Sequence, residues 1–352
     1  MTGQPIRVLV VDDSALMRDV IPAILNRASD IQVVATASDP MQARALIKQL
    51  NPDVLTLDVE MPKMDGVSFL EKIMTLRPMP VVMLSSLTQA GAETTLRALE
   101  LGAVDFITKP SLDLAAGLDA MAEDMIAKVR AAARAKVRRA TVRGEHKQVA
   151  PLGLKTSETV IALGASTGGV EVLGRLIAAL PADAPGIVIT QHMPPKFTAN
   201  FAARLDQNVA LAVSEAETGR RLRPGQVVIA PGDRHLVLKR SGADFICHLD
   251  DGPAVSGHKP SVDVMFRSVA RACGANAIGV ILTGMGRDGA DGLLEMRQAG
   301  AHTLGQNEDS ALVYGMPRAA QEAGAVMEEM TDQALPARFL ALAAKRSPAV
   351  RI

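Results

Sequence analysis

The chain has 352 residues, of which 48% are hydrophobic, and this length predicts two to three domains. Its 38 lysines and arginines balance 38 aspartates and glutamates, so no overall charge steers it to nucleic acid or a membrane. With seven Phe, one Tyr and no Trp, a base-stacking surface for nucleic acid is not expected. The aliphatic composition predicts helices packed on parallel strands.

The cysteine count and the N-terminal sequence bear on location. Two cysteines, Cys247 and Cys273, are too few for a disulfide framework and fit a reducing cytoplasm. The first residues reach Asp12 without the apolar core of a signal peptide. The sequence contains no apolar stretch of about 18 residues or more, so no membrane-spanning helix is expected. We therefore expect a cytoplasmic protein with no membrane insertion.

Residues 1–125 alternate short apolar runs with helical patterns. Strands are predicted at residues 7–11, 32–35, 54–57, 81–84 and 105–108. Five strands with helices between them are typical of a small doubly wound α/β domain with a parallel sheet. Pro22 lies inside the first helical stretch, where it should kink or end the helix.

Polar residues end four of these five strands: Asp12 and Asp13, then Asp58, Ser85 and Lys109. The carboxyl ends of parallel strands meet at one edge of the sheet. Three carboxylates gathered there repel one another, and a hard divalent cation is their natural neutraliser. A carboxylate beside such a cation, with a hydroxyl and an ammonium nearby, can accept a phosphoryl group. Asp58 is therefore the candidate phosphorylation site.

The strings VVDDSALMR, LTLDVEMPKMDG, VVMLSS and GAVDFITKP resemble the response-regulator receiver family over about 120 residues. The resemblance implies Mg²⁺ at Asp12, Asp13 and Asp58. It also implies that a histidine kinase phosphorylates Asp58 and that Ser85 and Lys109 contact the phosphoryl group. In the receiver pattern, Ser85 and Phe106 form the switch pair.

Residues 126–158 change in character and are predicted to be a basic interdomain linker. Between residues 128 and 147 eight lysines and arginines face a single acid, Glu145. The alanine-rich first half is compatible with a helix. The alternative function of the basic run is to bind an anionic partner.

Residues 159–352 are expected to form a second, mostly parallel α/β domain. Strands are predicted at 160–163, 186–190, 226–230 and 277–282, and a small β-hairpin at 235–249 around Ser241 and Gly242. A helix follows the first of these strands, because apolar residues recur at helical spacing between Val170 and Leu180.

Three short motifs in this half each follow an apolar run: GASTGG with Ser166, QHM with His192, and GRDG with Asp288. A serine, a histidine and an aspartate supply a nucleophile, its base and a carboxylate that orients the base. The order Ser, His, Asp differs from that of α/β-hydrolases. A helix starting near Thr167 would point backbone N–H groups at an oxyanion.

Each motif taken alone admits another interpretation. GASTGG also suits a phosphate-binding loop, and residues 284–289 fit the dinucleotide pattern G-x-G-x-x-G, with Glu308 about twenty residues later. Against a dinucleotide-dependent oxidoreductase stand the late position of the loop and Asp288, whose charge would repel a pyrophosphate. A non-catalytic signalling adaptor is a third possibility. No histidine pair in this half has supported metal-ligand spacing, so no metal or other cofactor is expected there.

The strings IALGASTGG, ITQHMPP, IAPGDRH, HKPSVDVMF, GVILTGMGRDGADG and QNEDSALVYGMPRAA resemble the chemotaxis methylesterase family, the CheB-type protein-glutamate methylesterases/glutamine deamidases. With the receiver pattern in front, the resemblance covers nearly the whole chain. It implies a triad of Ser166, His192 and Asp288, with Thr167 beside His192 and Met285 at the oxyanion. It further implies methylated chemoreceptors as substrates and a receiver that covers the catalytic face until Asp58 is phosphorylated.

Overall fold

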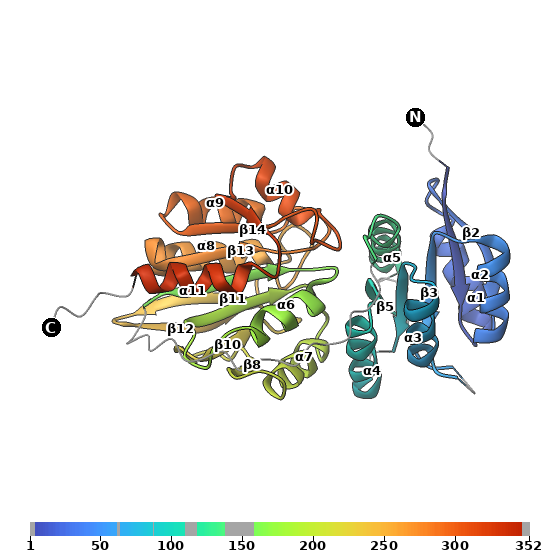
Figure 1. The fold of residues 1–352 in the computed structure, drawn as a ribbon, viewed down its shortest axis with the longest axis horizontal. Coiled ribbons are helices and arrows are strands. Elements are labelled where there is room, and N and C mark those ends of the chain that lie inside the picture. The colour runs from blue at the N-terminus through green and yellow to red at the C-terminus, as the bar shows by residue number, and fades with distance from the viewer. Residues whose placement is uncertain (1–3, 62–63, 87, 110–117, 138–157, 347–352) are drawn as a thin grey trace. The chain divides into compact units, whose positions relative to one another are not determined.

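The computed structural model describes residues 4–61, 64–86, 88–109, 118–137 and 158–346 (Figure 1). The chain divides into two compact units, Met1–Val142 and Arg143–Ile352. Each unit has an α/β fold.

The N-terminal unit contains a five-stranded sheet in which every strand pairs in parallel with its neighbours. The strands are β1 (Ile6–Val11), β2 (Ile31–Ala37), β3 (Val54–Asp58), β4 (Val81–Ser85) and β5 (Asp105–Thr108), in the order β2-β1-β3-β4-β5. This confirms the predicted doubly wound fold. The order reverses between β1 and β3, and ligands of such sheets bind at the carboxyl ends beside that switch point.

Five helices accompany this sheet in the described residues: α1 (Ala15–Leu25), α2 (Pro40–Leu50), α3 (Gly66–Leu76), α4 (Gln89–Glu100) and α5 (Leu118–Ala133). Short polar side chains cap the first four; Ser14, for example, accepts a hydrogen bond from the Met17 amide. Helices α1 and α5 pack together, as do α3 and α4.

Two helices bear on the expected helix limits: α1 does not end at Pro22, and α5 covers the start of the predicted linker, where the sequence is compatible with a helix. Helix α1 does not stop at Pro22: it continues to Leu25, and the Asn26 amide still donates to the Pro22 carbonyl at 2.9 Å. Proline lacks only its own N–H, so the next turn can close behind it. Helix α5 runs through residue 125 to Ala133, so the helix continues into the segment predicted as linker. The rest of that linker, residues 138–157, lies outside the described residues.

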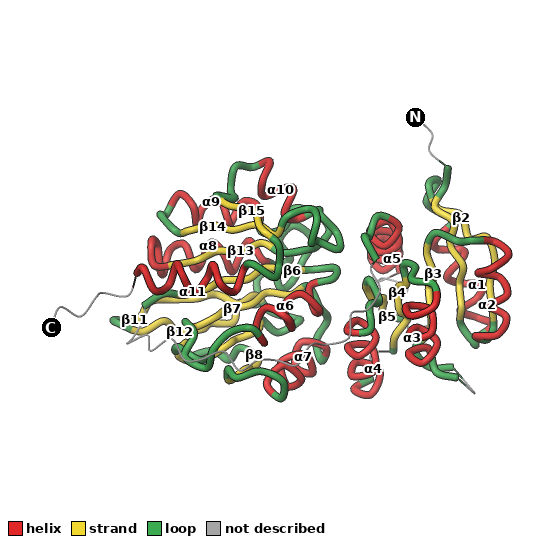
Figure 2. The backbone as a smooth tube through the Cα atoms, viewed as in Figure 1, coloured by secondary structure: helices red, strands yellow, loops and turns green. Residues whose placement is uncertain are grey.

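The C-terminal unit has a seven-stranded sheet in the order β15-β14-β13-β6-β7-β10-β8, all of whose pairings are parallel (Figure 2). Its strands are β6 (Val160–Ala165), β7 (Gly186–Gln191), β8 (Ala212–Glu215), β10 (Gln226–Ile229), β13 (Ala277–Ile281), β14 (His302–Gln306) and β15 (Glu328–Met330). The predicted hairpin is present as β11 (His235–Ser241) and β12 (Asp244–Asp250), joined by β9 (Arg221–Leu222) in a small antiparallel sheet.

Helices cover both faces of the larger sheet. They are α6 (Gly169–Ala178), α7 (Phe197–Asp206), α8 (Val262–Cys273), α9 (Ala290–Gln298), α10 (Met316–Glu322) and α11 (Leu335–Arg346), with a short 3₁₀ turn, η1 (Gly274–Asn276). The chain moves from β6 to β7 in one direction and from β13 to β14 in the other. Right-handed crossovers therefore put α6 and α9 on opposite faces.

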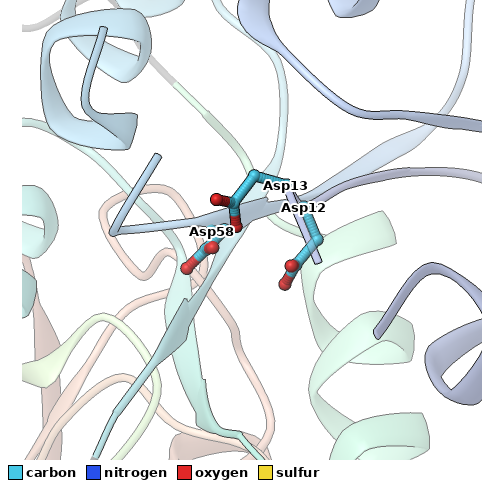
Figure 3. A group of neighbouring side chains, drawn as sticks. All are labelled: Asp12, Asp13 and Asp58. Carbon is cyan, nitrogen blue, oxygen red and sulfur yellow. The ribbon is translucent and has the colours of Figure 1, made fainter. Parts of the chain in front are cut away.

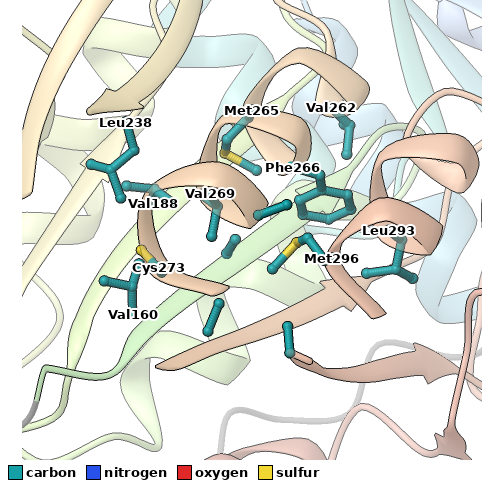
Figure 4. Close-up of a cluster of buried hydrophobic side chains, with 14 of the residues drawn as sticks. Val160, Val188, Leu238, Val262, Met265, Phe266, Val269, Cys273, Leu293 and Met296 are labelled. Carbon is teal, nitrogen blue, oxygen red and sulfur yellow. The ribbon is translucent and has the colours of Figure 1, made fainter. Parts of the chain in front are cut away.

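The core under α8 and α9 fixes the position of α8 on the sheet. Side chains of these two helices interlock with small strand residues, and Figure 4 shows Met265, Phe266 and Val269 of α8 beside Met296 of α9, over Val160 and Val188. Gly164 of β6 lies so close to α8 that a Cβ there would come within 2.2 Å of Val262. Close packing of this kind holds the N-terminus of α8 against the carboxyl ends of β6 and β13.

Candidate catalytic and phosphorylation sites

Strand register places Ser166 beside His192. In the parallel pair β6–β7, Ala165 is aligned with Gln191, so the next residues of the two strands, Ser166 and His192, emerge side by side at the carboxyl edge. The His192 amide donates to the Ala165 carbonyl at 3.1 Å, which continues the ladder to this point. Ser166 is half-buried, and the His192 side chain is 9% exposed.

Asp288 reaches the same point from the other side of β6. It follows β13, whose Ile281 is aligned with Gly164, and its Oδ2 lies 2.8 Å from Nε2 of His192. The chain order reverses between β6 and β13, so the three residues meet at the switch point of this sheet. The predicted serine, histidine and aspartate are thus brought to one place from three separate loops.

The first turn of α8 binds the Asp288 carboxylate. Oδ1 accepts from the Ser261 hydroxyl (2.8 Å) and the Asp263 amide (3.1 Å), while Oδ2 accepts from the Val262 amide (2.8 Å) and from His192. Burial raises the pKa of Asp288, but the hydrogen bonds from His192, Ser261 and Val262 outweigh it and leave the pKa below the ordinary value. The carboxylate is therefore held ionised and fixed in orientation.

The His192 ring has one nitrogen engaged and one available. Because Nε2 is paired with Asp288, a proton on Nε2 leaves Nδ1 unprotonated, and Nδ1 is buried with no hydrogen-bond partner among the described residues. His258 stacks on the ring, with centroids 3.8 Å apart and planes 10° from parallel. The nitrogen free to act as a base is therefore Nδ1, which is the reverse of the serine-protease arrangement.

Two polar side chains tie the loops of the site together. The Gln191 amide donates to the backbone carbonyls of Ser166 (2.9 Å) and His192 (3.2 Å). The Thr283 carbonyl accepts from the Ser166 amide at 3.0 Å, and the Thr283 hydroxyl donates to the Thr167 carbonyl at 3.0 Å. These two residues fix the backbone around the candidate nucleophile.

Thr167 and Met285 are the two residues predicted to support an oxyanion. Met285 is half-buried directly after Gly284, whose backbone packs so closely on Ser166 that a Cβ at residue 284 would lie 2.8 Å from the serine Cβ. Among the described residues the Met285 amide has no hydrogen-bond partner. Thr167 is buried, and its predicted contact with His192 stays a prediction.

The geometry disfavours a dinucleotide at the late glycine loop. A pyrophosphate would need the backbone N–H groups at the start of a helix. The helix that this loop opens is α9, where the Gly292 amide already donates to Asp263 at 2.7 Å, and the loop itself holds the buried carboxylate of Asp288. The acid predicted to hold a ribose, Glu308, lies 3.9 Å from Arg318.

Sequence reasoning missed Ser261, Gln191, Thr283 and His258 as neighbours of the three predicted residues. Ser261 had a usable signal, since a serine just before an apolar helical run is a typical N-cap. The other contacts join segments far apart in the chain, and no local pattern indicates them.

The N-terminal unit brings its acidic residues together as predicted. One ligand oxygen from each of Asp12, Asp13 and Asp58 lies within 4.8 Å of the others, at the carboxyl ends of β1 and β3 (Figure 3). Lys109 Nζ lies 3.0 Å from Asp12 Oδ2 and 2.7 Å from Asp58 Oδ2. Asp12 and Asp58 are buried and Asp13 is exposed.

This pocket is electrostatically poised for a cation. Burial raises the pKa of Asp58 to about 6; Lys109 opposes the shift and Asp12 adds to it. Burial lowers the pKa of Lys109, but Asp58 and Asp12 outweigh it and leave that pKa above the ordinary value. Apart from their ion pairs with Lys109, the Oδ2 atoms of Asp12 and Asp58 make no hydrogen bond. Carboxylate oxygens with free lone pairs are the ligands that Mg²⁺ prefers, so these residues fit that ion.

The two predicted switch residues are both buried, and α4 holds one of them. Thr95 of α4 donates to Ser85 Oγ at 2.6 Å, and Ser85 in turn donates to the carbonyls of Gly91 (3.3 Å) or Ser86 (3.2 Å). Phe106 is 3% exposed, with Lys128 Nζ 5.4 Å from its ring centroid. None of these Ser85 contacts goes to Asp58, so the Ser85 hydroxyl hydrogen would have to turn away from the Gly91 or Ser86 carbonyl to reach a phosphoryl group.

No helix among the described residues is both long enough and apolar enough to cross a bilayer.

Comparison with known families matches both units. Residues 161–339 match the family model described as CheB methylesterase, and residues 8–122 match the response regulator receiver domain. A solved structure of the Thermotoga maritima CheB methylesterase catalytic domain is 36% identical, with a TM-score of 0.52. It covers 53% of this chain and 100% of that domain.

Curated relatives match along the whole chain. A protein of Chromohalobacter salexigens named protein-glutamate methylesterase/protein-glutamine glutaminase is 54% identical over 100% of both chains. A protein of Escherichia coli K12 with the same name is 58% identical over 92% of this chain and 93% of its own length.

Proposed function

Because the chain belongs to the CheB methylesterase family and carries a receiver domain in front, we propose that Ser166, His192 and Asp288 are its catalytic triad. The protein is a protein-glutamate methylesterase with glutamine deamidase activity, regulated by phosphorylation. Neither a dinucleotide-dependent oxidoreductase nor a non-catalytic adaptor is favoured. The contact of 2.8 Å between His192 and Asp288, beside a serine placed by strand register, carries the proposal.

The chemistry follows from the positions of the three side chains. Ser166 Oγ attacks the γ-carbonyl carbon of a glutamyl methyl ester while Nδ1 of His192 takes the hydroxyl proton. The Met285 amide stabilises the developing oxyanion. Breaking the carbon–methoxy bond releases methanol, which receives the proton from Nδ1. Water, deprotonated at the same nitrogen, then releases the γ-carboxylate and restores Ser166. A glutamine loses ammonia in place of methanol.

Asp288 makes the histidine effective in two ways. Its Oδ2 holds the ring with the proton on Nε2, so that Nδ1 stays a base, and its charge stabilises the imidazolium that forms after proton transfer. The hydrogen bonds from α8 keep the carboxylate ionised during this step.

We further propose that Asp58 is the phosphorylation site and that Asp12, Asp13 and Asp58 hold Mg²⁺. The ion, when bound, would neutralise negative charge on the transferred phosphoryl group. Lys109, which already contacts Asp58, would pair with a phosphoryl oxygen. Ser85 would exchange the hydrogen bond that it donates to the Gly91 or Ser86 carbonyl for one to the phosphoryl group, and Phe106 would adjust with it. This exchange would change the contacts of α4 and so transmit the signal.

The partners follow from this chemistry. A histidine kinase would supply the phosphoryl group, and methylated chemoreceptors would supply the esters. The unphosphorylated receiver (residues 1–125) would restrain the catalytic domain (159–352), beyond the linker 126–158, until Asp58 is phosphorylated. Cys247 and Cys273 are buried free thiols, which suits a cytoplasmic location.

The test is methanol release from methylated receptor by the full chain, with and without a small-molecule phosphodonor. Wild type is expected to be stimulated, and Asp58→Asn to keep its basal rate without the stimulation. A stimulated Asp58→Asn would place the switch elsewhere. No methanol release under either condition would overturn the proposed function.

A further inference from the structure

The start of helix α8 is anchored from outside the helix. Ser261, its N-cap, uses its hydroxyl to accept from the Val264 amide (3.4 Å) and to donate to Asp288 (2.8 Å). The Ser261 backbone amide donates to Nδ1 of His235 at 3.0 Å. The position of the turn that binds Asp288 therefore depends on this histidine.

The partners of His235 define its protonation state. His235 begins β11 and is 1% exposed, and its Nε2 lies 2.9 Å from the Pro253 carbonyl. A carbonyl can only accept, so Nε2 carries a hydrogen, while the Ser261 amide can only donate, so Nδ1 carries none. Both contacts are satisfied only by a neutral ring with its hydrogen on Nε2.

We propose that His235 is a positioning residue of the esterase site, which holds the Ser261 amide and thereby sets the first turn of α8 against Asp288. The contacts run from His235 to Ser261, from Ser261 to Asp288, and from Asp288 to His192. The inference rests on the proposed triad. In this series of hydrogen bonds, His235 reaches His192 only through Ser261 and Asp288.

The proposal predicts which kinetic constant changes. If the first turn of α8 shifts, two or three of the donors to Asp288 lengthen, and the His192 ring loses its fixed orientation. Misplacement of a catalytic group by about 1 Å can cost about 10²-fold in rate. The change is confined to the groups that hold Asp288 and His192 in place, so kcat should fall while KM stays the same.

Asparagine and glutamine each reproduce one of the two contacts of the His235 ring, so the two variants distinguish between those contacts. The Oδ1 of asparagine can take the place of Nδ1 and accept from the Ser261 amide, with no donor to Pro253. The amide nitrogen of glutamine can take the place of Nε2 and donate to Pro253, with no acceptor for Ser261. The proposal requires the acceptor, so asparagine should rescue function and glutamine should not.

The experiment measures kcat and KM for methanol release by full-length wild type, His235→Asn, His235→Gln and His235→Ala. His248→Gln is the matched control, because His248 is half-buried on the partner strand β12 and makes none of these contacts. We expect His235→Gln and His235→Ala to lower kcat about 10- to 100-fold at similar KM. His235→Asn should retain most of kcat, and His248→Gln should match wild type. Equal losses in the Asn and Gln variants, or losses that only follow melting temperature, would overturn the proposal.

A measurement on wild type covers the case in which variants fail to fold. Nitrogen-15 NMR of the labelled full chain near neutral pH should show His235 neutral, with hydrogen on Nε2. A charged ring, or hydrogen on Nδ1, would refute the positioning role. Ser166→Ala in the same series tests the triad separately: if it stays active the proposed function fails, whereas a normal His235→Ala overturns only this inference.

Discussion

Replacing Asp288 by asparagine tests how the carboxylate orients His192. All four groups around the carboxylate are donors: His192 and Val262 to Oδ2, Ser261 and Asp263 to Oδ1. An amide has only one accepting end, so its NH₂ group must face two of these donors. The shape of the side chain is unchanged, which confines the effect to charge and hydrogen bonding.

The two orientations of that amide have different consequences. With nitrogen at the Oδ2 position, His192 must accept at Nε2, which moves its proton to Nδ1 and removes the base. With nitrogen at the Oδ1 position, the histidine tautomer survives, the Ser261 hydroxyl rotates to accept, and the Asp263 amide loses its partner. In both cases the imidazolium formed during catalysis loses its negative counterpart.

The expected magnitude follows from these losses. A wrong-tautomer Asp→Asn change in a serine-protease triad costs about 10⁴-fold in kcat, so we expect about 10³- to 10⁴-fold here, or about 4–5.5 kcal/mol. One buried amide left unsatisfied should also cost about 1–3 kcal/mol of stability. KM should change little, because Asp288 is buried beneath the histidine.

The assay compares methanol release and melting temperature for wild type, Asp288→Asn and a matched control. Asp332→Asn serves as the control, because Asp332 is also a buried carboxylate but pairs with Arg175 at 2.6 Å. It should lose stability and keep its activity. If Asp288→Asn retains more than about a tenth of kcat, or if Asp332→Asn loses as much, the role given to Asp288 is wrong.

Three further outcomes are expected. The double variant Ser166→Ala/His192→Gln should be no slower than Ser166→Ala alone, since the residues act as a unit; multiplicative losses in the same assay would contradict this. The melting temperature should fall in acid, because Asp288, whose pKa is lowered, contributes stability that is present above the ordinary carboxyl range and is lost as pH falls through its own lower pKa. A melting temperature that falls equally in Asp288→Asn would contradict this. Chelation of Mg²⁺ should abolish the phosphodonor response and leave the basal rate unchanged; a persistent response would mean that the ion is not needed at Asp58.

The sequence predicted the sites best where parallel strands end. Apolar runs followed by Asp12, Asp58, Ser166 and His192 identify strand ends, and in a parallel sheet all such ends share one edge. Asp288 lies seven residues beyond the last residue of β13, yet the two glycines of positive φ around it, Gly286 and Gly289, turn the loop back to the same edge. The closeness of these residues could therefore be predicted without knowledge of their side-chain orientations.

The parts that sequence could not supply depend on side-chain direction and distant contacts. No pattern shows that Nε2 of His192 faces Asp288, because both ring nitrogens are chemically suited to either role. The binding of Asp288 by α8 joins residues 25 to 27 positions apart in sequence. The hydrogen bond from Thr95 to Ser85, at 2.6 Å, joins α4 to the end of β4, and no local pattern pairs these two residues.

The two edge strands of the seven-stranded sheet were also beyond prediction. Strand β8 has four residues, of which only Val213 is buried, and β15 has three, none of them buried. Edge strands of this length carry too few apolar residues to show a period.

The central claim is that Ser166 is the nucleophile of the esterase. The most direct measurement is the rate of methanol release by full-length Ser166→Ala relative to wild type, with melting temperature recorded to confirm folding. Alanine fits the small space beside Gly284, so the variant should fold and lose about 10⁴-fold or more in rate. A folded variant that keeps more than a few per cent of the wild-type rate would contradict the account.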